Sequence, residues 1–185
     1  MIRRPPRSTP KPSSAASDVY KRQVIAASVI LKKPIKGLMD SKRLSSKKRE
    51  DLSQIIIENS VFAIGAADSH EIDQINILQA SLLAMQRSLE KLDMQPKKVL
   101  VDGNHIFETS TEIEAIVGGD NLIPSISAAS IVAKVYRDRL MMEYSKEFPN
   151  YGFDKHKGYP TKLHKEMLKR YGLTRIHRRT FKGVN

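Results

Sequence analysis

Short apolar runs of strand length alternate with longer helical patterns along most of this chain, and this alternation constrains the fold more than any other feature. The runs VIAASVIL (24–31), VFAIGAAD (61–68) and KVLVD (98–102) are almost continuously apolar, which is typical of strands buried on both faces. Helical patterns separate them at 46–59 and 76–92. The alternation predicts an α/β fold with a mixed or parallel sheet.

The helical segments carry recognisable faces and ends. Asp68 followed by Glu71 predicts a capping box at a helix start. The helix predicted over 76–92 has apolar residues at alternating spacings of four and three, namely Leu78, Leu82, Met85, Leu89 and Leu92. A short strand is expected over 113–120, a long helix over 125–148 ended by Pro149, a loop over 151–160 and a last amphipathic helix over 161–171.

The charge balance points to a polyanionic partner. The chain of 185 residues has a net charge of +12, and residues 1–23 account for only +5 of it, so the remainder is basic too. Such a balance favours nucleic acid. Cysteine is absent, which excludes a disulfide framework and a Cys-based zinc site. No apolar run approaches the ~18 residues of a membrane span, so no membrane association is expected.

Residues 1–23 differ in character from everything after them. They contain four prolines and one acidic residue and show no strand or helix period, which predicts disorder. Their Arg- and Ser-rich composition could also suit a transit peptide, but the prolines oppose the amphipathic helix such a peptide needs. The ending SSAASDVYKRQ resembles a translated sequencing adapter. We therefore expect a non-native tail, with native protein beginning at Val24.

Two aspartates follow apolar strand patterns beside glycine. Asp102 ends VLVD and is followed by Gly103, and Asp120 ends IEAIVGGD. Ligands bind at strand ends in open α/β sheets, and Mg²⁺ prefers a few carboxylates completed by water and substrate phosphate. DGN and GGDN are also ordinary turn sequences. The pattern therefore leaves two interpretations open, which are a turn residue and half of a metal site.

Other polar residues have weaker signals. Asp138 lies mid-helix between Arg137 and Arg139, where a solvated surface ion pair is the simpler interpretation. The segment DKHKGYPTKLH (154–164) combines lysines for phosphate contacts with Tyr159 as a flat face for a sugar or base. The same segment also fits a solvated loop with Tyr159 packed on the core. Its two histidines, eight residues apart, do not have the spacing of metal ligands.

An ordered series of motifs resembles the bacterial ribonucleases H of type 2, the ribonuclease HII family. The series spans about residues 24 to 182 and reads GLMDSKRLS, HEIDQINILQASLLAMQR, VLVDGN, GGDNLIPSISAASIVAKVYRD, FPNYGFDKHKGYPTKLH and HRRTF. The resemblance implies an RNase H-like fold over 24–185, with a central mixed sheet flanked by helices and a helical C-terminal part. It also implies a monomeric cytoplasmic bacterial enzyme of ribonucleotide excision and of DNA replication and repair.

The resemblance implies a specific activity. Members cut RNA in RNA–DNA hybrids and at ribonucleotides embedded in duplex DNA, with four carboxylates holding two Mg²⁺ or Mn²⁺ ions. Matched motif by motif, Asp102 and Asp120 resemble the third and fourth of these carboxylates, and Asp138 resembles an acid near the site. Tyr159 resembles the tyrosine that stacks at the RNA–DNA junction. The basic residues expected to contact nucleic acid are Lys42, Lys134, Lys157 and Arg178.

One motif of the family has no counterpart here. The first two carboxylates belong to a segment close to GVDEVGRGPLAG on an opening strand, and this chain has neither the Asp-Glu pair nor the Gly-Arg-Gly loop. We therefore expect a missing first strand, an exposed sheet edge, poor solubility and little hydrolysis. The alternatives are a catalytically dead nucleic-acid binder and a structural or ribosome-associated basic protein.

Overall fold

Strands and helices alternate as the sequence pattern predicts. The computed structural model describes residues 23–38, 44–159 and 161–177. Lys42, Arg178 and residues 1–22 lie outside the described residues. The elements are β1 (Val24–Leu31), α1 (Ser46–Glu58), β2 (Ser60–Ala67), α2 (Ser69–Glu90), β3 (Lys98–Asp102), β4 (Glu112–Ile116), the 3-10 turn η2 (Gly119–Asn121), α3 (Pro124–Glu147), the 3-10 turn η3 (Pro149–Tyr151), α4 (Phe153–His156) and α5 (Lys162–Tyr171).

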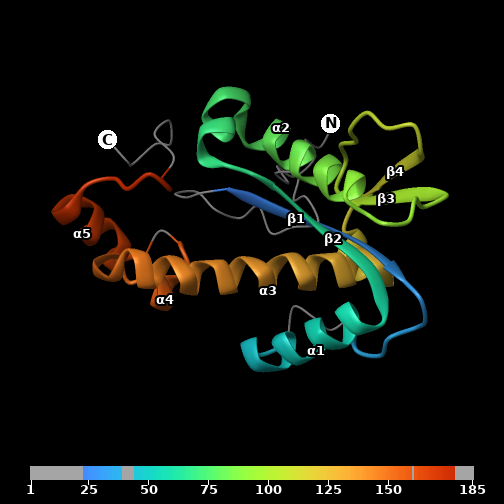
Figure 1. Cartoon of the computed structure of the whole chain (residues 1–185), viewed down its shortest axis with the longest axis horizontal. Coiled ribbons are helices and arrows are strands. Elements are labelled where there is room, and N and C mark those ends of the chain that lie inside the picture. The colour runs from blue at the N-terminus through green and yellow to red at the C-terminus, as the bar shows by residue number, and fades with distance from the viewer. Residues whose placement is uncertain (1–22, 39–43, 160, 178–185) are drawn as a thin grey trace, which may run out of the picture.

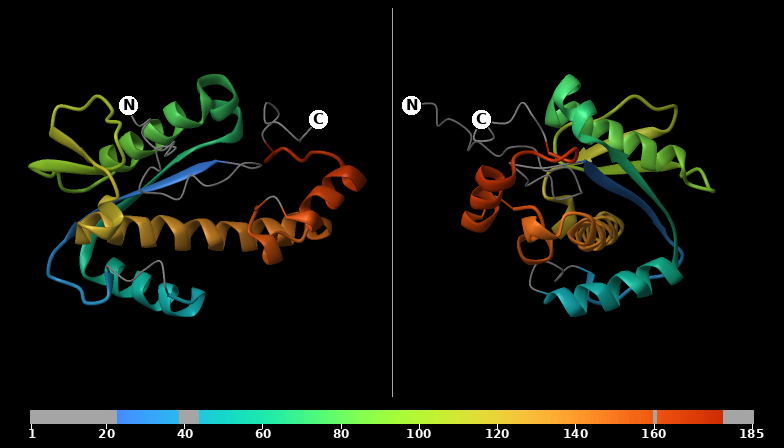
Figure 2. Two further views of the ribbon diagram at one scale, coloured as in Figure 1. Left: turned by 180° about the vertical axis from the view of Figure 1, so that it is seen from behind. Right: turned by 60° about the vertical axis from the view of Figure 1, so that its left-hand side comes forward.

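Helices cover both faces of the antiparallel strand pair formed by β1 and β2. Helix α2 lies on one face, while α1 and α3 lie on the other, as Figures 1 and 2 show. Side chains alternate across a strand, so Val24 and Ala26 of β1 pack in the cluster that contains α2. Ile25 and Ala27 of β1 pack in the cluster that contains α1 and α3. Double coverage explains why VIAASVIL is apolar on both faces.

The four described strands form two separate two-stranded sheets. Strands β1 and β2 are antiparallel, with Val24 opposite Ala67. Strands β3 and β4 are parallel, with Asp102 opposite Ile116. Within the described residues, no strand pairs with the second edge of β1 or of β3. The described strands therefore run in mixed directions, with one antiparallel pair and one parallel pair.

Helix α2 begins as the sequence predicts, but it is longer and kinked. Asp68 accepts a hydrogen bond from the Glu71 backbone and Glu71 accepts one from the Asp68 backbone, which completes the capping box. The helix includes residues 69–75 as well as 76–90, so it ends two residues before the predicted end at residue 92, and Asn76 interrupts it with φ of 66°. The side chain of Asn76 accepts from Leu78 N at 2.9 Å, which restarts the helix after the kink.

Two local boundaries differ from the sequence prediction. The strand expected over 113–120 ends at Ile116, because Gly118 takes the left-handed conformation and residues 119–121 form the turn η2. The loop expected over 151–160 contains the short helix α4, which lies between two left-handed residues, Gly152 and Lys157. The helical C-terminal part is otherwise as expected, and Pro149 follows the end of α3.

No helix in the described ranges is long and apolar enough to cross a bilayer.

Candidate nuclease site

Asp102 lies at the carboxyl end of β3 and is almost entirely buried, with 7% of its surface exposed. The Gly103 N–H donates to Ile116 O at 2.9 Å, so pairing with β4 continues one residue past the strand and fixes the Asp102 backbone. Gly103 has φ of 119°, a conformation that turns the chain away at once. A crevice beside Asp102 is walled by side chains of α2, namely Leu78, Ser81, Leu82 and Met85.

Asp120 lies on η2, the turn that connects β4 to α3. Its carboxylate accepts a hydrogen bond from the Asn121 side-chain amide at 2.9 Å. Turn η2 contacts both β3 and α3. The structure therefore places the two acids predicted from the sequence on neighbouring elements. Asp102 is the last residue of β3, and Asp120 lies four residues after the end of β4.

The donor set for a metal is small in the described part of the chain. No group of three His, Asp, Glu or Cys side chains that could hold a metal ion is found among those residues. Asp102 and Asp120 supply two carboxylates, which suits a hard divalent cation that keeps water and substrate phosphate as its other ligands.

Tyr159 is held against α3 by two cationic side chains. Lys134 Nζ donates to the Tyr159 hydroxyl at 3.4 Å. The Arg137 guanidinium carbon lies 5.6 Å from the centroid of the Tyr159 ring, within cation–π range. Lys134 and Asp138 are one helical turn apart on α3, and both are half-buried. The tyrosine, Lys134 and Asp138 thus belong to one region of the molecule.

Sequence reasoning missed Arg137, which is buried although it is charged. Its position three residues after Lys134 was the available signal, because such residues share a helix face. Arg139 points elsewhere, and its Nε donates to Glu50 of α1 at 2.6 Å. The two arginines that flank Asp138 therefore have different partners, the first beneath Tyr159 and the second on α1.

The side chain of Lys157, one of the residues predicted to contact phosphate, is turned toward a methionine of α3. It has a left-handed φ of 47°, and its Nζ lies 2.6 Å from Met142 Sδ on α3. A nucleic-acid contact by Lys157 would require this side chain to turn outward.

Backbone hydrogen bonds fix the segment that carries Tyr159. The Tyr159 N–H donates to His156 O at 2.7 Å, and its carbonyl accepts from Thr161 N at 2.8 Å. His164 Nδ1 lies 3.1 Å from the same carbonyl. Because a carbonyl only accepts hydrogen bonds, Nδ1 of His164 carries the proton. The tyrosine is therefore presented by a constrained backbone.

Three buried histidines form the support beneath this segment. His156 and His164 stack with their ring centroids 4.6 Å apart. His177 Nδ1 accepts from Thr174 N at 2.9 Å, so its Nε2 carries the proton and faces His164 Nε2 at 3.4 Å. The sequence spacing did not favour metal binding by His156 and His164, and in the structure their two rings stack beneath the loop.

Aromatic rings packed against these histidines are also held in place by specific contacts. Tyr151 stacks on Phe153 with centroids 5.4 Å apart. The Tyr151 hydroxyl donates to Gly172 O at 2.9 Å, and burial raises the pKa of this phenol. The ring cluster ties α4 and α5 to the C-terminal end of α3, whereas Tyr159 lies against the middle of that helix.

Solved structures of two ribonucleases H resemble this structure over most of the chain. The ribonuclease H2 of Pyrococcus horikoshii superimposes with a TM-score of 0.75 at 25% identity, covering 94% of this chain and 93% of that one. Bst-RNase HIII in complex with Mn²⁺ gives a TM-score of 0.76 at 15% identity, covering 94% of this chain and 66% of that one. The fold is therefore RNase H-like, of the class shared by these ribonucleases.

Sequence comparison narrows the class to one family. Residues 20–184 match the Ribonuclease HII family. The ribonuclease HII of Coxiella burnetii is 52% identical over 164 residues, covering 87% of this chain and 81% of the relative. That of Pelagibacter ubique is 50% identical over 165 residues, covering 88% and 89%. The chain belongs to the ribonuclease HII family, whose members are enzymes that hydrolyse nucleic acid.

Proposed function

We propose that this chain acts on RNA–DNA hybrids and on ribonucleotides embedded in duplex DNA, as an endonuclease that uses Mg²⁺ or Mn²⁺. The observation that carries the proposal is that Asp102 and Asp120 lie on contacting elements, β3 and η2, in a member of the ribonuclease HII family. The net charge of +12 supports a polyanionic substrate. The proposed working form is a cytoplasmic monomer.

The chain's own residues have distinct proposed roles. Asp102 and Asp120 would hold the divalent ions, with Asn121 orienting the Asp120 carboxylate through its amide. When bound, such ions activate the attacking water and stabilise the leaving 3′ oxygen. Tyr159 would stack on the nucleic acid at the ribonucleotide, whose 2′-hydroxyl distinguishes RNA from DNA. Asp138 is proposed as a further acid near the reacting phosphate.

The basic residues would position the backbone of the substrate. Lys134 lies beside the Tyr159 hydroxyl and would meet the phosphate next to the stacked nucleotide. Lys42, Lys157 and Arg178 are proposed as further phosphate contacts on the basis of the motifs that contain them.

A second candidate function is hybrid binding without turnover. Two divalent ions about 3.5–4 Å apart need several negative ligands, and the described residues contain no group of three metal-ligating side chains. We therefore propose, as the second candidate, that this chain binds hybrids without cleaving them.

Both proposals are tested with one fluorescein-labelled 20-base-pair RNA–DNA hybrid and the DNA duplex of the same sequence. Anisotropy measures binding, and gel electrophoresis measures cleavage in Mg²⁺ and in Mn²⁺. We expect metal-dependent preference for the hybrid, and Asp102→Asn and Asp120→Asn should each weaken it about tenfold, ~1.4 kcal/mol. Asp93→Asn is the matched control, because Asp93 is exposed and follows α2.

The outcomes separate the candidates. Fast cleavage that the two Asn variants abolish supports the endonuclease and rules out the binder, while binding without cleavage supports the second candidate. Equal affinity for hybrid and DNA, unaffected by metal or by either variant, would leave only a general basic protein.

A further inference from the structure

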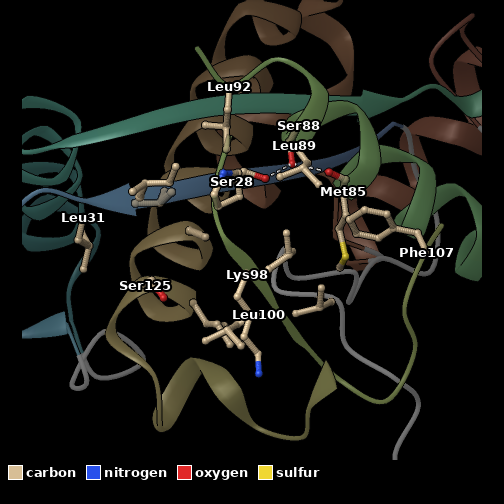
Figure 3. A pocket seen from close by; sticks show the side chains of 18 residues that line it. Ser28, Leu31, Met85, Ser88, Leu89, Leu92, Lys98, Leu100, Phe107 and Ser125 are labelled. Atoms are coloured by element: carbon tan, nitrogen blue, oxygen red, sulfur yellow. Dashed lines mark hydrogen bonds between the residues drawn. The ribbon is translucent and has the colours of Figure 1, made fainter. Parts of the chain in front are cut away.

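The interior of this protein changes in character along helix α3. Beside the first turn of α3, a cavity of about 300 Å³ between β1 and β3 has a mainly apolar lining that includes Leu89 and Leu92 (Figure 3). Near the C-terminal end of α3, the buried side chains include polar rings, namely those of His156, His164 and His177. Buried polar atoms are nearly always hydrogen-bonded. The partners of these rings therefore indicate what the rings hold in place.

A chain of hydrogen bonds runs from the turn after α5 to the backbone of Tyr159. The N–H of Thr174 donates to His177 Nδ1 at 2.9 Å, and the Thr174 hydroxyl lies 2.7 Å from the same nitrogen. Nε2 of His177 faces His164 Nε2 at 3.4 Å. Nδ1 of His164 lies 3.1 Å from the carbonyl oxygen of Tyr159. Two imidazole rings therefore connect residue 174 to residue 159.

The protons on these two rings are placed from opposite ends of the chain. A backbone N–H only donates, so Thr174 makes His177 Nδ1 an acceptor and leaves the His177 proton on Nε2. A carbonyl only accepts, so His164 carries its proton on Nδ1 and presents Nε2 as an acceptor. The two independent assignments agree where the rings meet, because one Nε2 then donates and the other accepts. The chain has one direction, toward Tyr159, and such ordered bonds strengthen one another.

Burial holds this order in place. His164 is fully buried, and His177 is nearly so. The ring of His156 stacks on that of His164 with centroids 4.6 Å apart, and the ring of Phe153 meets it edge-on at 6.1 Å. Because a buried donor without an acceptor is costly, rotation of either imidazole is opposed. His164 is therefore held in one ring plane and in one tautomer.

Tyr159 is anchored at two separate points. Its side chain contacts Lys134 and Arg137 of α3. Its carbonyl accepts from Thr161 N at 2.8 Å, which is a bond within the same segment, and from His164 of α5. The ring is thus tied to α3 and the backbone to α5. A side chain that is ordered before binding loses less conformational freedom when it stacks on a ligand.

We propose that His164 is a positioning residue for Tyr159, and that its Nδ1–H holds the Tyr159 backbone in the conformation that presents the ring to the ribonucleotide. His177 orders His164 through the contact of their Nε2 atoms. The inference rests on the proposed function, because it takes Tyr159 as the residue that stacks on the hybrid. His164 is fully buried, so it acts through Tyr159 and does not touch the substrate.

Two substitutions separate the two nitrogens of this ring. In His164→Asn, the amide nitrogen takes the place of Nδ1 and donates to the Tyr159 carbonyl, but the side chain is too short to reach His177. In His164→Gln, the amide reaches the place of Nε2 and accepts from His177, but it no longer bonds to Tyr159. Because His177 keeps its acceptor only in His164→Gln, we expect this variant to have the higher melting temperature.

Hybrid binding by the full chain should follow the opposite order. We expect His164→Asn to bind the hybrid within about twofold of the unsubstituted protein, and His164→Gln to bind about fivefold more weakly, as for one lost hydrogen bond. Anisotropy with the labelled hybrid measures both affinities. A purely structural role for His164 would make binding follow stability, so equal binding by the two variants, or tighter binding by His164→Gln, overturns the proposal.

The same pair of variants in a Tyr159→Ala background is the matched control. Without the positioned ring, the difference in hybrid affinity between His164→Asn and His164→Gln should disappear, because coupled residues lose their effect together. A difference that persists in this background shows that His164 acts by another route, and it overturns the proposal.

Hydrogen–deuterium exchange without nucleic acid distinguishes failure of this inference from failure of the proposed function. His164→Gln should speed exchange of the Tyr159 and Thr161 amides at least about threefold, whereas His164→Asn should not, and β2 should be unchanged in both. Unchanged exchange in His164→Gln overturns the proposal, also when His164→Asn fails to fold. A lower melting temperature for His164→Gln than for His164→Asn contradicts the direction of the chain and overturns it too. The expected exchange without any preference for hybrid supports the anchoring by His164 and rejects the proposed function.

Discussion

Helix α2 packs onto β2 at Gly65 with no room for a side chain. A Cβ atom built on Gly65 would lie 1.9 Å from Ala84 O and 2.5 Å from Ser88 N. Both are backbone atoms of α2, so no side-chain rotation can relieve the contact. We predict that Gly65→Ala destabilises this protein far more than a surface substitution does.

The size of the effect follows from these distances. Ordinary contact requires about 3.5 Å, so α2 must move by roughly 1.5 Å from β2. Inserting a methyl group into a packed interface costs about 1–3 kcal/mol. Ala80 and Ala84 are fully buried in that interface, and a gap of 0.5–1 Å forfeits about a quarter to a half of each contact. We expect a total loss of about 3–5 kcal/mol in the free energy of unfolding.

The assay is urea unfolding followed by circular dichroism, together with the melting temperature. For a domain of this size, 1 kcal/mol shifts Tm by about 2–4 °C, so Gly65→Ala should lower Tm by about 10 °C. Gly172→Ala is the matched control, because nothing lies within 4 Å of its Cβ position and only its φ of 75° is strained. It should cost about 1–3 kcal/mol, because its ψ of −165° puts Gly172 in a region that glycine alone adopts freely.

If Gly65→Ala costs no more than Gly172→Ala, α2 is not seated on β2 at the observed distance. The wall of α2 beside Asp102 would then also lose its structural basis, since the same helix supplies both contacts.

Three further predictions concern the site and its supports. Tyr159→Ala should weaken hybrid binding about tenfold, because base stacking contributes ~1–3 kcal/mol. Tyr159→Phe should change the affinity little, because the hydrogen bond from Lys134 to the Tyr159 hydroxyl is long at 3.4 Å. Anisotropy measures both affinities, and equal effects of the two substitutions would exclude stacking. His164→Phe should destabilise by about 1–3 kcal/mol in urea unfolding, because buried His177 Nε2–H loses its acceptor; a neutral result would contradict the tautomers assigned. Hydrogen bonds from Arg87 hold the pKa of Glu71 below its usual value, so the pair stabilises above the unfolded pKa and that stability disappears as pH falls through the folded one. Arg87→Met should remove about 0.5 kcal/mol of this pH dependence, discounted for exposure, and an unchanged acid unfolding profile would refute the link.

The order and type of the main elements could be predicted from the sequence because their signals are local. The capping box of Asp68 and Glu71 involves residues three apart, and Pro149 ends α3 through its own ring geometry. Strand β1, which is covered by helices on both faces, is recognisable in the sequence as a continuous apolar run. Each of these signals depends on neighbours in the chain, so no knowledge of the folded state was needed.

The site could be predicted only in part. The aspartate of VLVD was recognisable as a strand-end acid, and Asp102 is one. Asp120 was expected at the end of a strand and lies in a turn instead, because the left-handed Gly118 breaks the strand pattern. The family motifs indicated Tyr159, but Arg137 beneath its ring was missed, since charge and helix spacing do not specify what packs above a helix.

The sequence by itself determined the alternation of strands and helices, the basic character and the family motifs, all of which depend on residue types and short-range spacing. Only the tertiary structure decided that three histidines meet beneath Tyr159, that α2 approaches β2 at Gly65, and that β1 and β3 leave a cavity between them. These features join residues far apart in the chain. Their formation depends on how elements pack against one another, which local propensity does not encode.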